Sequence, residues 1–178
     1  MASRRKAREC ALQMLFQWDI AKDAPEKVEQ LFWGGQQTNK EQGHRSPWNL
    51  RPLSEQELAA ATTEDPVLRA FADELFRGTV SSVEQIDAAI RKHAEHWRLE
   101  RMAVVDRNVL RLAVYELTKR QETPPVVVIN EALEVARKFS DEESVAFING
   151  LLDTIRKGLP DMSANARLGR VVNGPTGT

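Results

Sequence analysis

The chain has 178 residues, enough for one domain or for two small helical halves that share a core, and its 25 basic and 26 acidic residues give a net charge of −1. This balance excludes a chain-wide attraction to polyanions, so a nucleic-acid partner would have to bind a local basic patch. The single cysteine excludes an internal disulfide. No apolar run approaches the roughly 20 residues that span a bilayer. We therefore expect a cytoplasmic protein without a membrane partner.

Residues 3–20 have the periodicity of a helix with two apolar faces. The main face consists of Ala7, Cys10, Ala11, Met14, Leu15 and Trp18. A thinner stripe on the opposite side consists of Leu12, Phe16 and Ile20. Burial on both sides would explain this pattern, and a protein-docking role for Phe16 is the alternative, because aromatic anchors are enriched at interfaces. Cys10 lies on the core face, which indicates a buried structural thiol.

Four cations precede the first acid at the start of this helix. They are Arg4, Arg5, Lys6 and Arg8. A helix N-terminus favours anions, so helix stability does not explain this cluster. The phosphate backbone of RNA or DNA would explain it, because each cation displaces counterions from a phosphate. A solvated N-terminus is the alternative.

The middle of the chain contains one short helix and a long irregular stretch. A helix is expected over residues 26–33, after which the periodicity stops. We interpret residues 34–65 as an insertion with an isolated Trp48. A capping-box pattern at Ser54 predicts a brief helix over 55–61 within it.

Order restarts at Asp65 with a helix that we expect to end at Gly78, because glycine is a common residue just past a helix C-terminus. The next helix begins at Ser82. Its apolar side consists of Val83, Ile86, Ile90 and Trp97. His93 and His96 have a spacing that metal ligands can have, but no cysteine or carboxylate cluster accompanies them, so we expect no metal site.

Residues 106–120 form the centre of the predicted fold. On a helical wheel the apolar side chains of this region fill an arc of roughly 200°, whereas an ordinary surface helix has a stripe nearer 100°. The apolar residues are Val105, Val109, Leu110, Leu112, Ala113, Val114 and Leu117. The narrower polar arc consists of Arg107, Asn108, Arg111, Tyr115 and Lys119. Neighbours on two sides would be needed to cover the apolar arc, so we predict an all-α fold with the other helices packed around this one.

Two more helices are expected, over about 126–139 and from a capping box that starts at Ser140. The core face of the last helix consists of Val145, Ile148, Leu152, Ile155 and Leu159. Phe147 points about 120° away from that face, which makes its ring a candidate for stacking on single-stranded bases. Contact with an adjacent helix is the alternative. Residues 161–178 have the composition of a disordered tail.

The sequence has no phosphate-binding glycine loop, no nucleophile elbow and no metal-ligand cluster. We therefore expect a protein that is not an enzyme, with no catalytic residues and no cofactor.

Four blocks of sequence resemble the NusB family of bacterial transcription antitermination factors. They are RRKARECALQMLFQWDI, DRNVLRLAVYEL, INEALEVARKF and SVAFINGLLD, in the family's order, within about residues 4–33 and 67–157. The resemblance implies a single all-α domain over 1–160, built as a NusB-like bundle of two three-helix halves, about 3–92 and 97–159. The insertion over 34–65 and the tail look longer than family members usually have.

The resemblance also implies a function. NusB proteins pair with NusE, a ribosomal small-subunit protein, and the pair binds the boxA element of nascent RNA. This helps to assemble an antitermination complex with other Nus factors on RNA polymerase, notably during ribosomal RNA transcription. By resemblance, the residues of the RNA surface are Arg4, Arg5, Lys6, Arg8, Ser144 and Phe147, and those of the NusE-binding surface are Phe16, Asp106 and Arg107. Asp106 would also complement the helix dipole, since it lies in a first helical turn.

Two other functions stay open at this point. The chain could be a helical protein-docking module without its own RNA-binding role, or a homodimer in which a second copy covers the second apolar stripe of residues 3–20. A NusB-like domain also occurs fused to an RNA cytosine methyltransferase, but this chain lacks the length and the glycine-rich nucleotide loop of that enzyme.

Overall fold

The computed structural model describes residues 2–34, 65–94, 96–120 and 122–159. These residues form helices and no strand, so the predicted all-α fold class is confirmed. The helices are α1 (Ala2–Ala21), α2 (Pro25–Gly34), α4 (Pro66–Ser81), α5 (Val83–His93), α6 (Val104–Lys119), α7 (Pro125–Phe139) and α8 (Glu142–Gly158), with a short 3-10 helix, η2 (Leu99–Arg101), before α6. The brief helix expected over 55–61, Trp48 and the tail over 161–178 lie outside the described residues.

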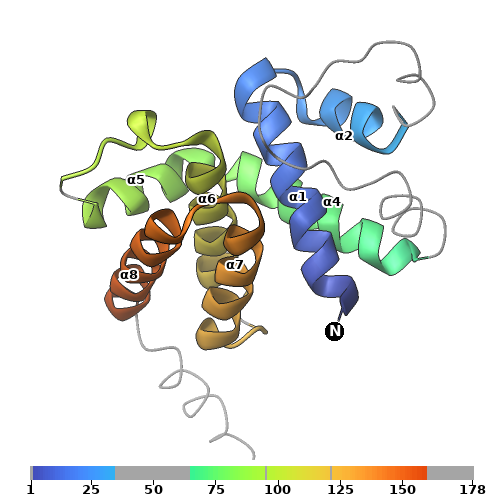
Figure 1. The fold of residues 1–178 in the computed structure, drawn as a ribbon. Coiled ribbons are helices and arrows are strands. Elements are labelled where there is room, and N and C mark those ends of the chain that lie inside the picture. The colour runs from blue at the N-terminus through green and yellow to red at the C-terminus, as the bar shows by residue number, and fades with distance from the viewer. Residues whose placement is uncertain (1, 35–64, 95, 121, 160–178) are drawn as a thin grey trace, which may run out of the picture.

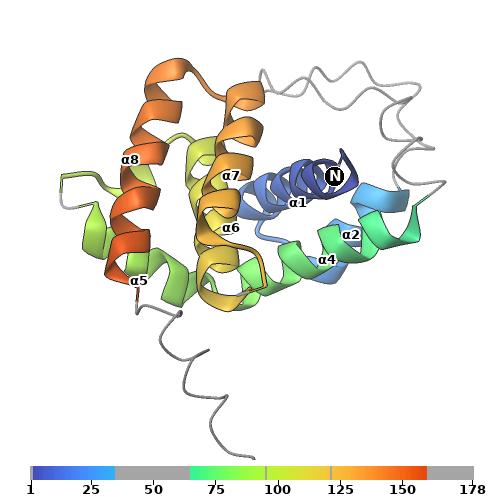
Figure 2. The same ribbon diagram turned by 90° about the horizontal axis from the view of Figure 1, so that it is seen from below.

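Helix α6 lies in the middle of the molecule, with α1, α2 and α4 on one side and α5 and α8 on the other (Figure 1). It packs against α1, α4, α5, α7 and α8, as its wide apolar arc predicted. From below, α7 lies between α1 and α8 (Figure 2). The basic start of α1 and the start of α8 therefore face opposite sides of α7.

Two clusters of buried apolar side chains meet at α6. The first cluster unites α1, α2 and α4 with Leu112 of α6. The second unites α5, α6, α7 and α8, and it includes Leu12 of α1. Of the second apolar stripe on α1, Leu12 and Phe16 are buried and Ile20 is exposed. Burial on both sides therefore accounts for most of the apolar pattern of α1.

The polar arc of α6 is also partly buried, because it carries ion pairs to two other helices. The Asp19 carboxylate of α1 accepts hydrogen bonds from Asn108 Nδ2 at 3.1 Å and from Arg111 Nη1 at 3.0 Å. The Arg111 guanidinium also donates two hydrogen bonds of 2.7 Å to Asp87 of α5. Asn108 is completely buried and Arg111 is 7% exposed, so this part of the arc faces protein rather than water.

The expected end of α4 at Gly78 is wrong, because the helix continues to Ser81. Gly78 lies within α4 and allows close packing of α4 against α6. A Cβ atom built on Gly78 would lie 2.1 Å from the ring of Tyr115, so only a residue without a side chain lets α4 approach α6 this closely. The start of α4 is as expected, with the Asp65 carboxylate accepting hydrogen bonds from the Val67 and Leu68 amides.

Two further helix boundaries differ from the prediction. Helix α5 ends at His93, so Trp97 lies beyond it and is exposed instead of belonging to its core face. Periodicity alone could not reveal this, since a residue past the helix end still matched the spacing. Helix α8 is capped by Asp141, which accepts a hydrogen bond from the Ser144 amide at 2.7 Å. Ser140, the expected cap, donates its hydroxyl hydrogen to Asp106 at 2.5 Å.

Candidate nucleic-acid interface

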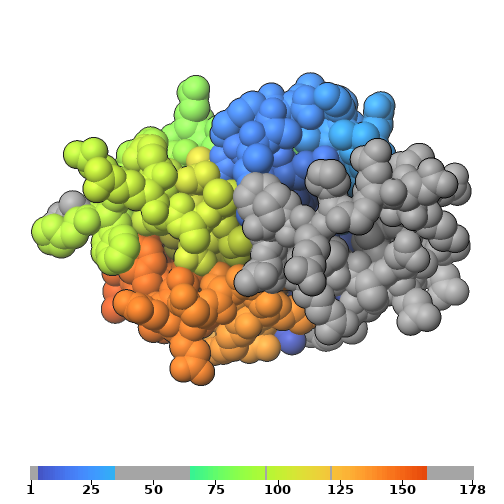
Figure 3. Space-filling model, turned by 45° about the horizontal axis from the view of Figure 1, so that its top comes forward, coloured from blue at the N-terminus to red at the C-terminus, as the bar shows by residue number. Residues whose placement is uncertain are grey.

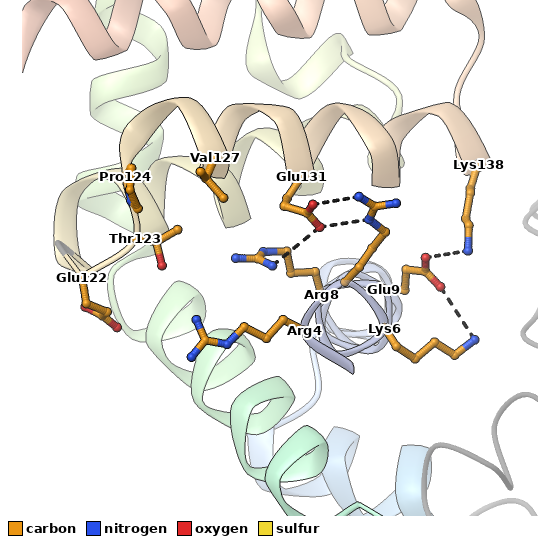
Figure 4. Close-up of a pocket in the computed structure, with 11 residues that line it drawn as sticks. Arg4, Lys6, Arg8, Glu9, Glu122, Thr123, Pro124, Val127, Glu131 and Lys138 are labelled. Atoms are coloured by element: carbon orange, nitrogen blue, oxygen red, sulfur yellow. Dashed lines mark hydrogen bonds and ion pairs between the residues drawn. The ribbon is translucent and has the colours of Figure 1, made fainter. Parts of the chain in front are cut away.

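A groove between α1 and α7 collects the N-terminal cations (Figure 4). It has a volume of about 570 Å³. Its charged side chains are Arg4, Arg5, Lys6, Arg8 and Lys138 on the positive side and Glu9, Glu122 and Glu131 on the negative side. We call it the basic groove. The lining carries five cations and three acids, and one of the cations, Arg8, is paired with Glu116 outside the lining.

Arg5 and Lys6 lie at the rim of the basic groove, each next to an acid. The Arg5 guanidinium donates to both oxygens of Glu131, from Nε at 3.0 Å and from Nη2 at 2.8 Å. The hydrogen bond and charge of Glu131 raise the pKa of Arg5, and the Arg5 bond lowers the pKa of Glu131. Arg5 Nη1 also lies 3.5 Å from Glu134, and the Arg5 side chain is 41% exposed, so a phosphate that binds Arg5 competes with two acids.

Glu9 is buried in the wall of the groove between two lysines. Its carboxylate lies 2.6 Å from Lys138 Nζ and 3.7 Å from Lys6 Nζ. The acid therefore draws a lysine of α1 and a lysine of α7 to the same end of the groove (Figure 4). Sequence reasoning did not find Lys138, because the ion pair joins residues on helices that are far apart in the chain.

Arg8 differs from the other three cations of α1. It is 3% exposed, and its guanidinium donates to Glu116 of α6 from Nε at 2.8 Å and from Nη2 at 2.7 Å. The ring of Phe71 packs against three guanidinium groups, with centroid distances of 5.7 Å to Arg4, 5.6 Å to Arg8 and 4.8 Å to Arg120. Cation–π attraction of this kind orients a guanidinium group. Arg8 thus anchors α1 to α6, whereas Arg4 remains exposed.

Phe147 and Ser144 lie together near the start of α8, in a second pocket of about 180 Å³. The pocket also contains Asp106 and Trp97. Phe147 is half-buried, and its ring centroid lies 4.9 Å from that of Trp97 at an interplanar angle of 47°. The segment before α6 and the junction of α7 with α8 are side by side on this face (Figure 3). Ser144, Phe147 and Asp106 are therefore neighbours, although the resemblance assigns Asp106 to the NusE-binding surface and the other two to the RNA surface.

The other two residues expected on the partner surface are largely covered. Phe16 is 6% exposed. Arg107 donates to Asp19 from Nε at 2.9 Å and from Nη2 at 2.7 Å, and its side chain is 13% exposed. Neither residue lines the two pockets just described.

Asp19 is surrounded by three cations, Lys22, Arg107 and Arg111. Burial by itself would raise the pKa of its carboxyl, but hydrogen bonds from Lys22 and Arg107 and the charges of Arg111 and Arg107 outweigh burial and lower that pKa to about 2. Asp19 is consequently ionised at any physiological pH, and it fixes the positions of α1 and α6 relative to each other.

The family profile of the NusB family matches residues 5–157 of the chain. The chain belongs to the NusB family. The resemblance carried by the four sequence blocks is thereby confirmed. Among NusB relatives, the transcription antitermination protein NusB of Solibacter usitatus (strain Ellin6076) is 45% identical over 164 residues, which cover 92% of this chain and 95% of the relative. That of Koribacter versatilis (strain Ellin345) is 45% identical over 157 residues, covering 88% and 90%.

Solved NusB structures share the fold. The NusB of T. maritima is 32% identical, with a TM-score of 0.68, and the match covers 92% of this chain and 96% of that one. A crystal structure of antitermination factors NusB and NusE in complex with dsRNA matches at 25% identity with a TM-score of 0.66, covering 89% and 99%. In the described parts of the chain, no helix is long and apolar enough to cross a membrane.

Proposed function

We propose that the chain is a transcription antitermination factor that binds boxA-type single-stranded RNA together with NusE, within an antitermination complex on RNA polymerase. Membership of the NusB family and the antitermination proteins that match along nearly the whole chain support this role. A structural neighbour holds NusE and dsRNA, which supports a shared protein–RNA surface. The role is one of binding and assembly, not of catalysis.

The observation that carries the RNA part is the cluster of cations in the basic groove. Arg4, Arg5 and Lys6 are its accessible cations on α1, and Lys138 extends it along α7. We assign them to phosphate contacts, which provide affinity but little sequence preference. We assign Arg8 a supporting role without direct RNA contact, because it is buried and its hydrogen bonds to Glu116 hold the start of α1 in place.

The start of α8 is the proposed base-binding part of the surface. Phe147 presents a half-buried ring and Ser144 lies in the same pocket. A ring of this kind can stack on an unpaired base, while a hydroxyl group can hydrogen-bond to a base edge or a ribose. Because α7 separates this part from the basic groove, an RNA strand that binds both must cross α7 (Figure 2).

The proposed NusE surface lies around the start of α6, next to the pocket of Ser144. Asp106 is its partly exposed acid, and the Ser140 hydroxyl orients it. Phe16 and Arg107 support this surface from below, since both side chains are largely covered. A homodimer that covers the second stripe of α1 has less support, because Ile20 is the exposed member of that stripe.

Fluorescence anisotropy with a labelled boxA-like single-stranded RNA tests the proposal, with and without NusE and over a range of salt concentrations. We expect NusE to tighten RNA binding. The double variant Arg4→Ala/Lys138→Ala should flatten the slope of log affinity against log salt by about 0.7 for each lost phosphate contact. Phe147→Ala should cost roughly 1–3 kcal/mol of binding free energy.

Lys27→Ala on α2 is the matched control, since it removes an exposed cation outside the basic groove. An unlabelled double-stranded RNA competitor tests the preference for single strands. RNA affinity that is independent of NusE, or a salt slope that the groove variant leaves unchanged, would contradict the proposal.

A further inference from the structure

Trp97 lies between α5 and η2 with an unusual exposure for its size. It is 59% exposed, although burial of an aromatic ring of this size would be favourable. The ring of Phe147 packs against the indole in a tilted arrangement, at the centroid distance of 4.9 Å given above. The two rings therefore form one aromatic surface, and most of Trp97 on that surface faces water.

A third pocket also borders the two rings, and its lining differs in charge from that of the pocket of Ser144. It has a volume of about 640 Å³. Its described lining includes the basic or titratable side chains Lys92, His93 and His96 and no acid. We call it the Lys92 pocket. The pocket of Ser144, by contrast, is lined by Asp106, Asp141 and Glu143 against a single cation, Arg101.

This difference between the described linings favours a phosphate at the Lys92 pocket over the pocket of Ser144. Three carboxylates repel a phosphate from the pocket of Ser144, whereas the described lining of the Lys92 pocket offers a lysine and two imidazoles. Gly150 contributes to the open shape of the Lys92 pocket, because a Cβ atom built there would meet nothing within 4 Å. The pocket therefore has space over α8 next to the aromatic surface.

We infer that Trp97 and Phe147 form a two-ring stacking platform for neighbouring bases of single-stranded RNA, with a phosphate of that strand held over the Lys92 pocket. The rings touch each other, so a base stacks on their free faces and not between them. Every base has a π-face, so Trp97 lengthens the RNA contact without demanding one base. This inference rests on the proposed function, and it adds Trp97 and Lys92 to the RNA surface.

The test compares three substitutions in the RNA titration with NusE. Trp97→Leu keeps apolar bulk but removes the ring, and it should weaken RNA binding roughly 5- to 150-fold, the range measured for loss of base stacking. Trp97→Phe keeps a ring and should retain most of the affinity. Gly150→Leu narrows the Lys92 pocket, which both rings line, and it should weaken RNA binding while leaving the thermal midpoint undiminished.

Leu31→Ala is the control, because it shortens an exposed apolar side chain on α2, away from the aromatic surface. If the wild-type protein with NusE fails to bind RNA, the proposed function and the platform are both overturned. If wild type binds and Trp97→Leu binds equally well, the platform alone is overturned. In a third outcome, Trp97→Leu weakens NusE binding in the absence of RNA, and this weakening accounts for the whole loss of RNA affinity. The aromatic surface would then be a protein-docking site, and the platform would also be overturned.

Discussion

The guanidinium of Arg8 and the carboxylate of Glu116 form a buried two-point ion pair that joins α1 to α6. Their hydrogen bonds are 2.8 and 2.7 Å long, and the two residues are 3% and 2% exposed. Charges buried to this degree are stable only while both partners are present, because each neutralises and hydrogen-bonds the other. One of the four N-terminal cations is therefore part of the interior.

Removing either partner should destabilise the protein strongly. Arg8→Ala or Glu116→Ala leaves an uncompensated buried charge, and we expect a loss of about 3–5 kcal/mol in the free energy of unfolding. Urea denaturation followed by circular dichroism measures this loss. Arg4→Ala is the matched control, since it removes an exposed arginine from the same helix, and it should change stability by less than about 1 kcal/mol. Equal effects of the two arginine substitutions would contradict the interpretation.

Acid should weaken the protein through Asp19. Its pKa is about 2 in the folded chain, below the ordinary value of 3.8 that applies to the unfolded chain, so the folded state favours the ionised form. A lowered pKa contributes stability above pH 3.8, and that stability is lost as the pH falls through the folded value. We expect a loss of about 2 kcal/mol between pH 4 and about pH 2, measured by urea denaturation at each pH.

The variant Asp19→Asn isolates this contribution. It should be less stable than wild type at neutral pH, because Arg107 and Arg111 lose their anionic partner, and the difference from wild type should shrink as the pH is lowered. Asp153→Asn on the exposed face of α8 is the control, since solvent-exposed ion pairs contribute little. A wild-type-minus-variant difference that stays constant with pH would count against the role of Asp19.

Two glycines in helices should respond to alanine in opposite directions. At Gly78 the new methyl group would overlap the Tyr115 ring, and we expect a destabilisation of about 1–3 kcal/mol. At Gly150 nothing lies within 4 Å, so alanine should stabilise α8 by up to about 1 kcal/mol through its higher helix propensity. Thermal unfolding of both variants gives the comparison. Adding Tyr115→Leu to Gly78→Ala should recover part of the loss, and no recovery would place the cost elsewhere.

Cys10 should be chemically silent in the folded protein. Burial in the cluster of α1, α2 and α4 raises the pKa of its thiol to about 12, so almost no thiolate exists at about pH 8. We expect no reaction with a thiol reagent until urea unfolds the chain. Ala70→Cys places a second thiol on the exposed face of α4, and that thiol should react in the native state. Rapid native labelling of wild type would show that the first cluster opens readily.

The sequence predicted the helices well because their apolar spacing is a local signal. Helix α6 is the clearest case, since its wide apolar arc predicted neighbours on two sides and its position in the centre. The helix ends were less predictable. The end at Gly78 was wrong because a glycine that permits close packing with Tyr115 looks, in sequence, like a glycine that ends a helix.

The pairing of charges could not be predicted from the sequence. Arg4 and Arg8 belong to the same basic run, yet one is exposed and the other is bound to Glu116, which lies 108 residues further along the chain. The same holds for Arg111, whose partners Asp87 and Asp19 are 24 and 92 residues away. Local patterns show where charge is concentrated, whereas long-range contacts decide which charges remain available to a ligand.

The central position of α6 has a consequence for the order of events during synthesis. Helices α1, α2 and α4 leave the ribosome first, but their apolar cluster lacks Leu112 until α6 has followed. The charged side chains of Arg8 and Asp19 on α1 also remain without their partners Glu116 and Arg111 until α6 has been made. We therefore expect the nascent chain to stay without stable tertiary structure until α6 has left the ribosome, and the second cluster to form only after α7 and α8 have followed.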